Sequence, residues 1–279
     1  MKNPPETDVV LDSLARCLHH HRMIPRPRCW RLAATFMSAA LMSTAVPAGS
    51  QAGTACPADP VMEPLHLPHL KAAIAARTEG LIVALGSSST EGAMASDSAH
   101  TYPAVLQTAL EEALPKAHVA VINRGIGGQD APEELARLES DVIAVRPQVV
   151  IWQVGANGAM RYADPVVFHK MVSEGVARLR TAGMDVILMD NQRSPRVLAA
   201  TDHIVLEDSL RDVARETRVN LFSRSRLMDA WSDEGAKPGL FTASDSLHHN
   251  DLGYECVSQT LAREIVAAIA TPVTVAASK

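Results

Sequence analysis

The chain has 279 residues, of which 47% are hydrophobic and 20% are charged. This is the composition of an ordinary globular protein, which excludes a disordered chain, a collagen-like repeat and a coiled coil. The net charge is −5, from 26 basic and 31 acidic residues. No basic stripe is present, so we expect no nucleic-acid partner. Four cysteines are too few for a fold built on disulfides.

The first fifty residues have the layout of a secretory signal peptide. Three arginines precede an apolar run without charges, and small residues follow it. Cleavage is expected after Ala48 or Ala52, and either Met1 or Met23 can serve as the start. We therefore interpret residues 1–52 as a signal peptide with an upstream extension, and we expect an exported protein, periplasmic or secreted.

Five short runs are apolar at nearly every position, which predicts buried strands of a parallel sheet. These runs are Leu81–Leu85, Val119–Ile122, Val149–Val154, Asp185–Met189 and Asn220–Phe222. Helical spacing of apolar residues predicts helices between and after them. These helices are Tyr102–Leu114, Pro132–Val145, Pro165–Ala182, Ile204–Thr217 and Leu252–Ile269. Strands that alternate with helices form βαβ units with right-handed crossovers.

The alternation predicts a three-layer α/β/α sandwich of the flavodoxin-like kind, with a five-stranded parallel sheet. We expect an N-terminal strap over residues 53–78, the α/β domain over 79–270 and a C-terminal tail over 271–279. No apolar run after residue 60 reaches the ~20 residues that a membrane span needs, so no stable span is expected. In such sheets, sites form beyond the carboxyl ends of the strands.

Loops that carry residues suited to catalysis follow the first three predicted strands. Ser88 lies in the GSSST loop after the first strand, where a helix N-terminus favours negative charge. A glycine-rich loop, NRGIGG, follows the second strand, and Asn157 after the third supplies an amide donor. Asp245 and His248 lie three residues apart, so the carboxylate can fix the imidazole tautomer. These are the groups that ester hydrolysis needs: a nucleophile, a base, a group that orients the base, and oxyanion donors.

These four motifs, in this order along the chain, resemble those of the SGNH, or GDSL-type, hydrolases. The sequence GSSST is similar to the motif of exported bacterial members. The resemblance covers roughly residues 80–270. It implies that Ser88 is the nucleophile and that His248 and Asp245 complete a catalytic triad. It implies neither a metal nor an organic cofactor.

The resemblance also implies an oxyanion hole formed by the Ser88 N–H, the Gly128 N–H and the Asn157 side chain. From the residues alone, Gly125 and Gly127 are alternatives to Gly128.

His249 is likewise an alternative to His248 as the base. A metal site at Asp245, His248 and His249 is not expected, because no further ligand lies at a useful spacing.

The chain departs from the family pattern at two positions. Ser87 stands where an aspartate usually precedes the nucleophile, and Gly158 stands where an aspartate usually follows the oxyanion asparagine. Two further features allow two interpretations. The segment 190–192 after the fourth strand is either a solvated turn or a wall of the substrate pocket, and Tyr254 either lines that pocket or packs in the core.

We therefore expect an exported serine esterase or acyl hydrolase that forms an acyl-enzyme from a small-molecule, carbohydrate or lipid ester. One alternative is an O-acyltransferase that uses the same site. The other is a catalytically silent module that binds carbohydrate or the cell envelope, because a fold does not dictate a function. The sequence leaves the acyl chain length and the oligomeric state open.

Two cysteines, Cys56 and Cys256, lie outside the predicted signal segment. An oxidising compartment permits them to pair, which would pin the N-terminal strap to the final helix. The alternative is a buried free thiol at Cys256, with Cys56 loose or lipidated.

Overall fold

A computed structural model of the chain describes residues 56–270. The predicted signal segment 1–52 and the predicted tail 271–279 lie outside the described residues. Within the described range, no helix combines the length and the apolar character needed to cross a membrane.

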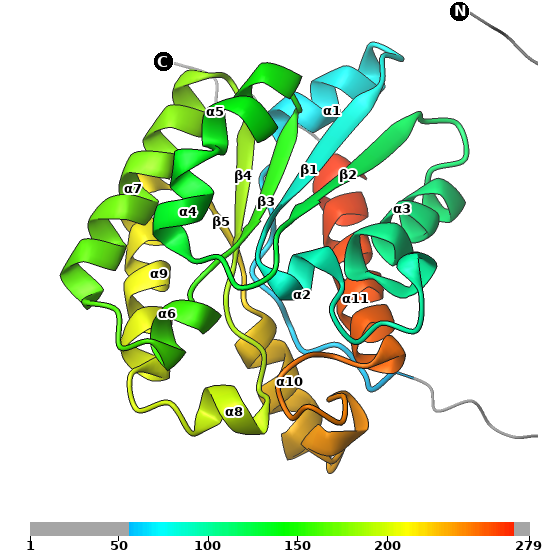
Figure 1. Cartoon of the computed structure of the whole chain (residues 1–279). Coiled ribbons are helices and arrows are strands. Elements are labelled where there is room, and N and C mark those ends of the chain that lie inside the picture. The colour runs from blue at the N-terminus through cyan, green and yellow to red at the C-terminus, as the bar shows by residue number, and fades with distance from the viewer. Residues whose placement is uncertain (1–55, 271–279) are drawn as a thin grey trace, which may run out of the picture. The chain divides into compact units, whose positions relative to one another are not determined.

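Five parallel strands form one sheet in the order β2-β1-β3-β4-β5 (Figure 1). The strands are β1 (Gly80–Gly86), β2 (Val119–Gly125), β3 (Val149–Gln153), β4 (Asp185–Met189) and β5 (Asn220–Phe222). The five predicted strands and the three-layer α/β/α fold are thus confirmed.

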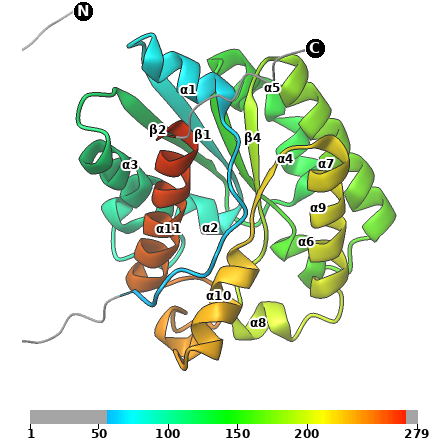
Figure 2. The same ribbon diagram turned by 180° about the vertical axis from the view of Figure 1, so that it is seen from behind.

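Helices cover both faces of the sheet (Figures 1 and 2). The helices before β3 are α1 (Pro68–Ala75), α2 (Ser88–Glu91), α3 (Tyr102–Ala113), α4 (Ala131–Ala136) and α5 (Leu138–Asp141). The later helices are α6 (Ala156–Met160), α7 (Pro165–Thr181), α8 (Pro195–Leu198), α9 (His203–Thr217), α10 (Arg224–Asp233) and α11 (Asp251–Ala270). Short 3₁₀ turns lie at Ser98–His100, Ile143–Val145 and Pro238–Leu240.

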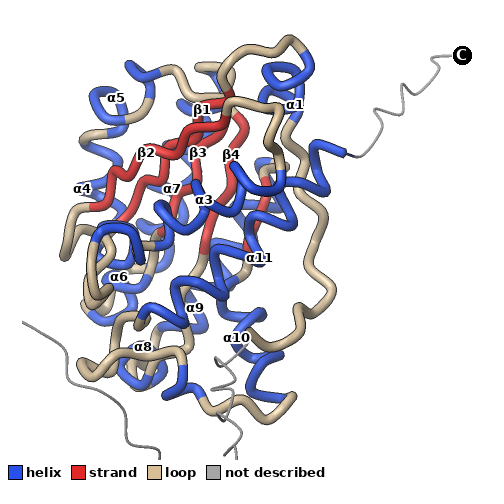
Figure 3. The backbone as a smooth tube through the Cα atoms, turned by 90° about the vertical axis from the view of Figure 1, so that its right-hand side faces the viewer, coloured by secondary structure: helices blue, strands red, loops and turns tan. Residues whose placement is uncertain are grey.

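Successive strand residues enter two separate cores. Ile82 and Ala84 of β1 pack with residues of α1, α3, α10 and α11, whereas Val83 and Leu85 pack with residues of α4, α5, α7 and α9. Figure 3 shows α3 and α11 in front of the sheet on the first of these faces. Burial on both faces is the physical reason why the strand sequences carry apolar residues without alternation.

The order of the strands creates a switch point at β1. The chain goes from β1 to β2 on one side and then crosses back to β3 on the other side of β1. The loops that follow β1 and β3 therefore diverge at the carboxyl edge of the sheet, which is where sites form in sheets of this kind.

One predicted helix is wrong, and several helices were not predicted. The predicted helix 132–145 is broken into α4, α5 and a 3₁₀ turn, and the break lies at Arg137. The Arg137 guanidinium donates to the carbonyl of Gly86 and to the side chain of Gln129, so the break lies where this side chain joins the loops after β1 and β2. Helices α1, α6, α8 and α10 were not among the predicted elements.

A disulfide joins Cys56 to Cys256 of α11, as predicted. Nearby, Asp59 accepts hydrogen bonds from Thr260 Oγ1 and Arg263 Nε, each over 2.6 Å. The segment before α1 is thus fixed to the last helix, beside which it runs in Figure 2.

Removal of this disulfide is expected to destabilise the fold. The bridge links positions 200 residues apart, and the loss of such a constraint on the unfolded chain costs about 2–5 kcal/mol. Cys56→Ala should lower the free energy of unfolding in urea by that amount. Reductant should destabilise the unaltered protein but not the variant. A digest made without reductant in which Cys56 and Cys256 are both alkylated would contradict the bridge.

Glu134 of α4 is a buried acid between the sheet and its helical cover. Its side chain is almost fully enclosed, and the Trp152 indole N–H donates to its Oε2 over 2.8 Å. Burial raises the pKa of Glu134 to about 8. The folded protein therefore keeps a proton on this carboxyl at pH values where the unfolded chain has lost it.

Glu134→Gln is expected to remove a pH dependence of stability. The folded-state pKa lies above the unfolded value of 4.5, so stability from this group is complete below pH 4.5 and falls as the pH rises toward 8, by at most ~1.4 kcal/mol per unit. Glutamine keeps an oxygen for the Trp152 N–H, so urea unfolding at pH 8 should show a more stable variant. The exposed Glu79→Gln serves as the control. An equal effect at pH 4 and pH 8 would contradict this account.

Candidate active site

Three predicted residues meet at the carboxyl edge of the sheet. Ser88 Oγ lies 2.7 Å from Nε2 of His248, and Nδ1 of the same ring lies 2.5 Å from Oδ2 of Asp245. All three residues are half-buried. A hydroxyl, an imidazole and a carboxylate in this order can activate the oxygen of Ser88 as a nucleophile.

Asp245 is held as a carboxylate by its own loop. Burial acts to raise its pKa, but hydrogen bonds from the Leu247 N–H and from the side chain and N–H of His248 outweigh this and lower the pKa. Both N–H groups donate to Oδ1 over 3.0 Å. An ionised carboxylate fixes Nδ1 as the protonated nitrogen of His248 and leaves Nε2 to accept a proton from Ser88.

Gln153 at the end of β3 secures the turn that carries Ser88. Its buried Oε1 accepts from Ser87 Oγ over 3.1 Å, and from Ser87 N and Thr90 Oγ1 over 3.3 Å each. Because Gln153 Oε1 is a neutral acceptor, it suits the hydroxyl of Ser87 as a donor. This contact explains why a serine fits at this position. Helix α2 begins at Ser88, so the nucleophile lies at a helix N-terminus.

The predicted oxyanion donors come from the segments that follow β1, β2 and β3. Among the described residues, neither the Ser88 N–H nor the Gly128 N–H has a hydrogen-bond acceptor. Asn157 Nδ2 donates to the carbonyl of Gln129 over 2.7 Å, and an amide nitrogen carries a second hydrogen. Arg161 Nη2 donates to the carbonyl of Gly128 over 2.6 Å. Two hydrogen bonds therefore join the loop after β2 to helix α6, which carries Asn157, and to Arg161 at its end.

The glycines of the loop after β2 have different surroundings. A Cβ on Gly125 would lie 2.0 Å from the backbone nitrogen of Glu91, so close packing accounts for this glycine. Gly127 lies beside the nucleophile, since its Cβ would be 3.9 Å from that of Ser88. Gly128 has a φ of +79° and is exposed. Of the three glycines, only Gly128 is both exposed and in the left-handed region.

Asp130 occupies the space that a side chain at position 158 would need. A Cβ on Gly158 would lie 2.8 Å from Asp130 Oδ2 and 3.2 Å from Oδ1. Burial raises the pKa of Asp130, while the Ala131 and Gly158 N–H groups and the Arg161 charge oppose the rise. The departure at Gly158 thus has a steric reason: a carboxylate from the neighbouring loop already fills the site.

His248 and the alternative base His249 have different surroundings. His249 is buried, its Nδ1 donates to the carbonyl of Phe241 over 3.0 Å, and its ring lies edge-on to Tyr254. Burial lowers the pKa of His249 to about 3, so the ring stays neutral. His249 is thus a core residue, and His248 alone contacts Ser88.

The interpretation of 190–192 as a solvated turn is wrong, because all three side chains are buried. Asp190 accepts from Ser223 Oγ, Ser225 Oγ and Ser225 N over 2.7–2.8 Å. Arg224, which is also buried, donates to the carbonyl of Asp190 and to Gln192 Oε1. Sequence reasoning missed this network because Arg224 lies in α10, a helix that was not expected.

Tyr254 is buried and donates to the carbonyl of Ala93 over 2.7 Å. Of the two interpretations offered by the sequence, packing in the core is the one that agrees with the structure.

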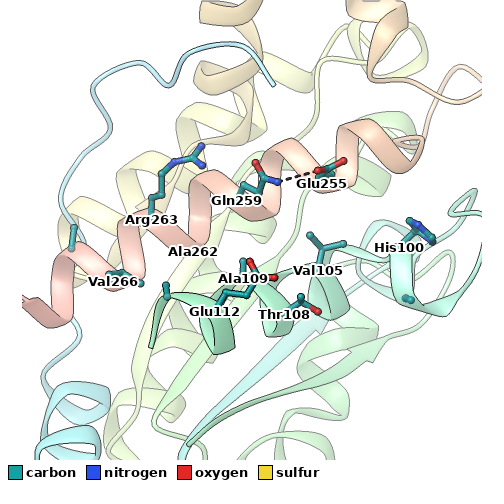
Figure 4. Close-up of a pocket in the computed structure, with 13 residues that line it drawn as sticks. His100, Val105, Thr108, Ala109, Glu112, Glu255, Gln259, Ala262, Arg263 and Val266 are labelled. Carbon is teal, nitrogen blue, oxygen red and sulfur yellow. Dashed lines mark hydrogen bonds between the residues drawn. The ribbon is translucent and has the colours of Figure 1, made fainter. Parts of the chain in front are cut away.

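A groove of about 900 Å³ runs between α3 and α11 (Figure 4). Its lining includes Val105 and Ala109 from α3 and Ala262 and Val266 from α11, with polar groups along its rim. None of the predicted site residues lines it. Within residues 56–270, no cluster of three or more His, Cys, Asp or Glu side chains suits a metal ion.

Comparison with known proteins gives one family match and many structural likenesses. Residues 53–271 match the non-GDSL lipase-like family. No curated protein matches the chain significantly. An α/β hydrolase from the metagenome of Lake Arreo, Spain, is 20% identical with a TM-score of 0.59, over 69% of this chain and 97% of that one. An acetylxylan esterase from Geobacillus stearothermophilus is 19% identical with a TM-score of 0.57, over 69% and 95%.

A third structure, a two-domain esterase active on acetylated mannans, is 21% identical with a TM-score of 0.65. The match covers 76% of this chain and 56% of that one. At these sequence identities, the similarity to the three solved structures establishes the fold.

The contacts of His248 predict an unusually reactive serine. A fluorophosphonate probe should label the protein at Ser88, because His248 can take the proton of the attacking hydroxyl. His248→Asn should slow labelling at least about a hundredfold.

His249→Asn is the matched control, since the asparagine amide can still donate to the carbonyl of Phe241. This variant should be labelled at close to the rate of the protein without substitutions. Labelling at a serine other than Ser88, or equal rates in the two variants, would contradict the assignment.

Proposed function

The chain belongs to the non-GDSL lipase-like family, and we propose from this premise that it is a serine carboxylic ester hydrolase of the SGNH type. The observation that carries the proposal is the contact series from Ser88 Oγ through the His248 ring to Asp245, over 2.7 and 2.5 Å. The fold shared with solved esterases supports it.

The reaction proceeds through two steps in this proposal. His248 Nε2 accepts the proton of Ser88 as Oγ attacks the ester carbonyl, and it then protonates the leaving alcohol. Water, deprotonated by the same nitrogen, then attacks the acyl-enzyme. The bond to Ser88 Oγ breaks, the acid is released, and His248 returns the proton to Ser88. Asp245 holds the Nδ1 proton and stabilises the imidazolium that forms in each step.

The oxyanion of each tetrahedral intermediate accepts from the Ser88 N–H, the Gly128 N–H and the Asn157 side chain. Support comes from the absence of other acceptors for the two backbone N–H groups among the described residues, and from the link between Asn157 and Gln129. Donors fixed before the reaction stabilise developing charge without reorganisation.

The proposed substrate class is short-chain carboxylic esters, with acetylated carbohydrates as the first natural candidates. The structural relatives include an acetylxylan esterase and an esterase active on acetylated mannans. Export is part of the proposal, because the disulfide between Cys56 and Cys256 suits an oxidising compartment. We assign the hydrolase domain to residues 79–270 and the strap to 53–78.

A series of p-nitrophenyl esters from acetate to palmitate tests the activity. The protein should turn over the acetate fastest, and Ser88→Ala should lose at least about a thousandfold in kcat/KM while it keeps its melting temperature. A Ser88→Ala variant that retains more than about a tenth of the activity would show that the proposed nucleophile is wrong.

Asn157→Ala tests the oxyanion hole separately. Loss of one donor to the developing charge should lower kcat by about 10²–10³, equivalent to about 2.7–4 kcal/mol, with little change in KM. Steady-state kinetics on the acetate ester measures both constants. An effect confined to KM would make Asn157 a substrate contact rather than an oxyanion donor.

A further inference from the structure

The loop that carries Asp245 and His248 is held in place by a residue from another part of the fold. Gln192, which follows β4, donates from Nε2 to the carbonyl of Leu247 over 2.9 Å. That carbonyl belongs to the same peptide group as the His248 N–H, which donates to Asp245 Oδ1 over 3.0 Å. The peptide group directly before His248 is therefore held at both of its polar ends.

Arg224 determines which way the Gln192 amide points. Arg224 is only 1% exposed, and its Nη2 donates to Gln192 Oε1 over 2.8 Å. A guanidinium only donates and a carbonyl only accepts, so one orientation of the amide satisfies both Arg224 and Leu247. In that orientation, Gln192 presents its N–H to the loop.

Arg224 is also held by groups other than Gln192. Its Nε donates to the main-chain carbonyl of Asp190 over 3.2 Å, and its charge interacts with the Asp190 side chain. The Asp190 side chain accepts from the hydroxyls of Ser223 and Ser225. Arg224 therefore belongs to a buried polar network that fixes its position independently of Gln192.

We propose that Gln192 is a positioning residue that sets the His248 ring against Ser88 through the Leu247 carbonyl. The inference rests on the proposed function, since it concerns the same site. A glutamate at 192 has the shape of glutamine and pairs well with Arg224, but it turns an oxygen instead of an N–H toward the carbonyl of Leu247. Repulsion between two oxygens then displaces the peptide group that leads into His248.

Two variants test this role with p-nitrophenyl acetate. Gln192→Met removes the donor and should lower kcat about tenfold, and Gln192→Glu adds repulsion and should lower it about a hundredfold, as expected for misplaced catalytic groups. KM should change less than about threefold in both variants. If Gln192 only fills space, the order is reversed, because glutamate is closer in shape to glutamine than methionine is.

A matched control and a double variant complete the test. Gln148→Glu, at the opposite end of the sheet, keeps the oxygen that accepts from the Leu81 N–H over 2.6 Å, and it should retain the unaltered kcat. In a His248→Ala background, Gln192→Glu should have little further effect on kcat, since it acts through the missing ring.

A kcat for Gln192→Glu that equals or exceeds that of Gln192→Met, or a change confined to KM, overturns the role of Gln192. Should Gln192→Glu fail to fold, an unaltered kcat in Gln192→Met overturns it equally. Ser88→Ala is measured alongside: retained activity there overturns the proposed function itself. If Ser88→Ala loses its activity, the proposed function stands, and a negative result with the Gln192 variants then counts only against the role of Gln192.

Discussion

The hydrogen bond between Ser88 Oγ and His248 Nε2 joins residues 160 positions apart in the chain, and the geometry of the site depends on it. Ser88 begins α2 just after β1, while His248 lies just before α11. Helix α11 packs against α3, and Tyr254 of α11 donates to the carbonyl of Ala93, directly beyond α2. The separation of the two catalytic groups is thus set by the packing of the first and last elements of the domain.

Two buried polar contacts near the site accompany departures from the sequence pattern that the chain otherwise resembles. The hydroxyl of Ser87 meets the amide oxygen of Gln153, which is neutral. The carboxylate of Asp130 stands where a side chain at Gly158 would lie. In both places the sequence departs from the pattern that it otherwise resembles, and a side chain from a neighbouring segment occupies the position beside it.

The strands and the three-layer fold could be predicted from sequence because burial on both faces of a parallel sheet leaves a direct mark, a short run without polar residues. The D-x-x-H spacing likewise predicted the Asp245–His248 contact, since both partners lie in one loop. The break at Arg137 was not predicted, since the contact that distinguishes this residue, a long-range bond to the Gly86 carbonyl, leaves no pattern in the local sequence. Burial of 190–192 was also hidden, since polar residues indicate solvent until Arg224, a distant partner, is known.

The central claim is that Ser88 forms a covalent acyl intermediate. Rapid acid quenching of the protein during turnover of p-nitrophenyl acetate, followed by intact-mass and peptide mass spectrometry, tests it most directly. The account predicts a mass increase of one acetyl group, on the peptide that contains Ser88, and no such increase in the Ser88→Ala variant. Release of nitrophenol without any acetylated protein, or acetylation at another residue in the burst, would contradict it.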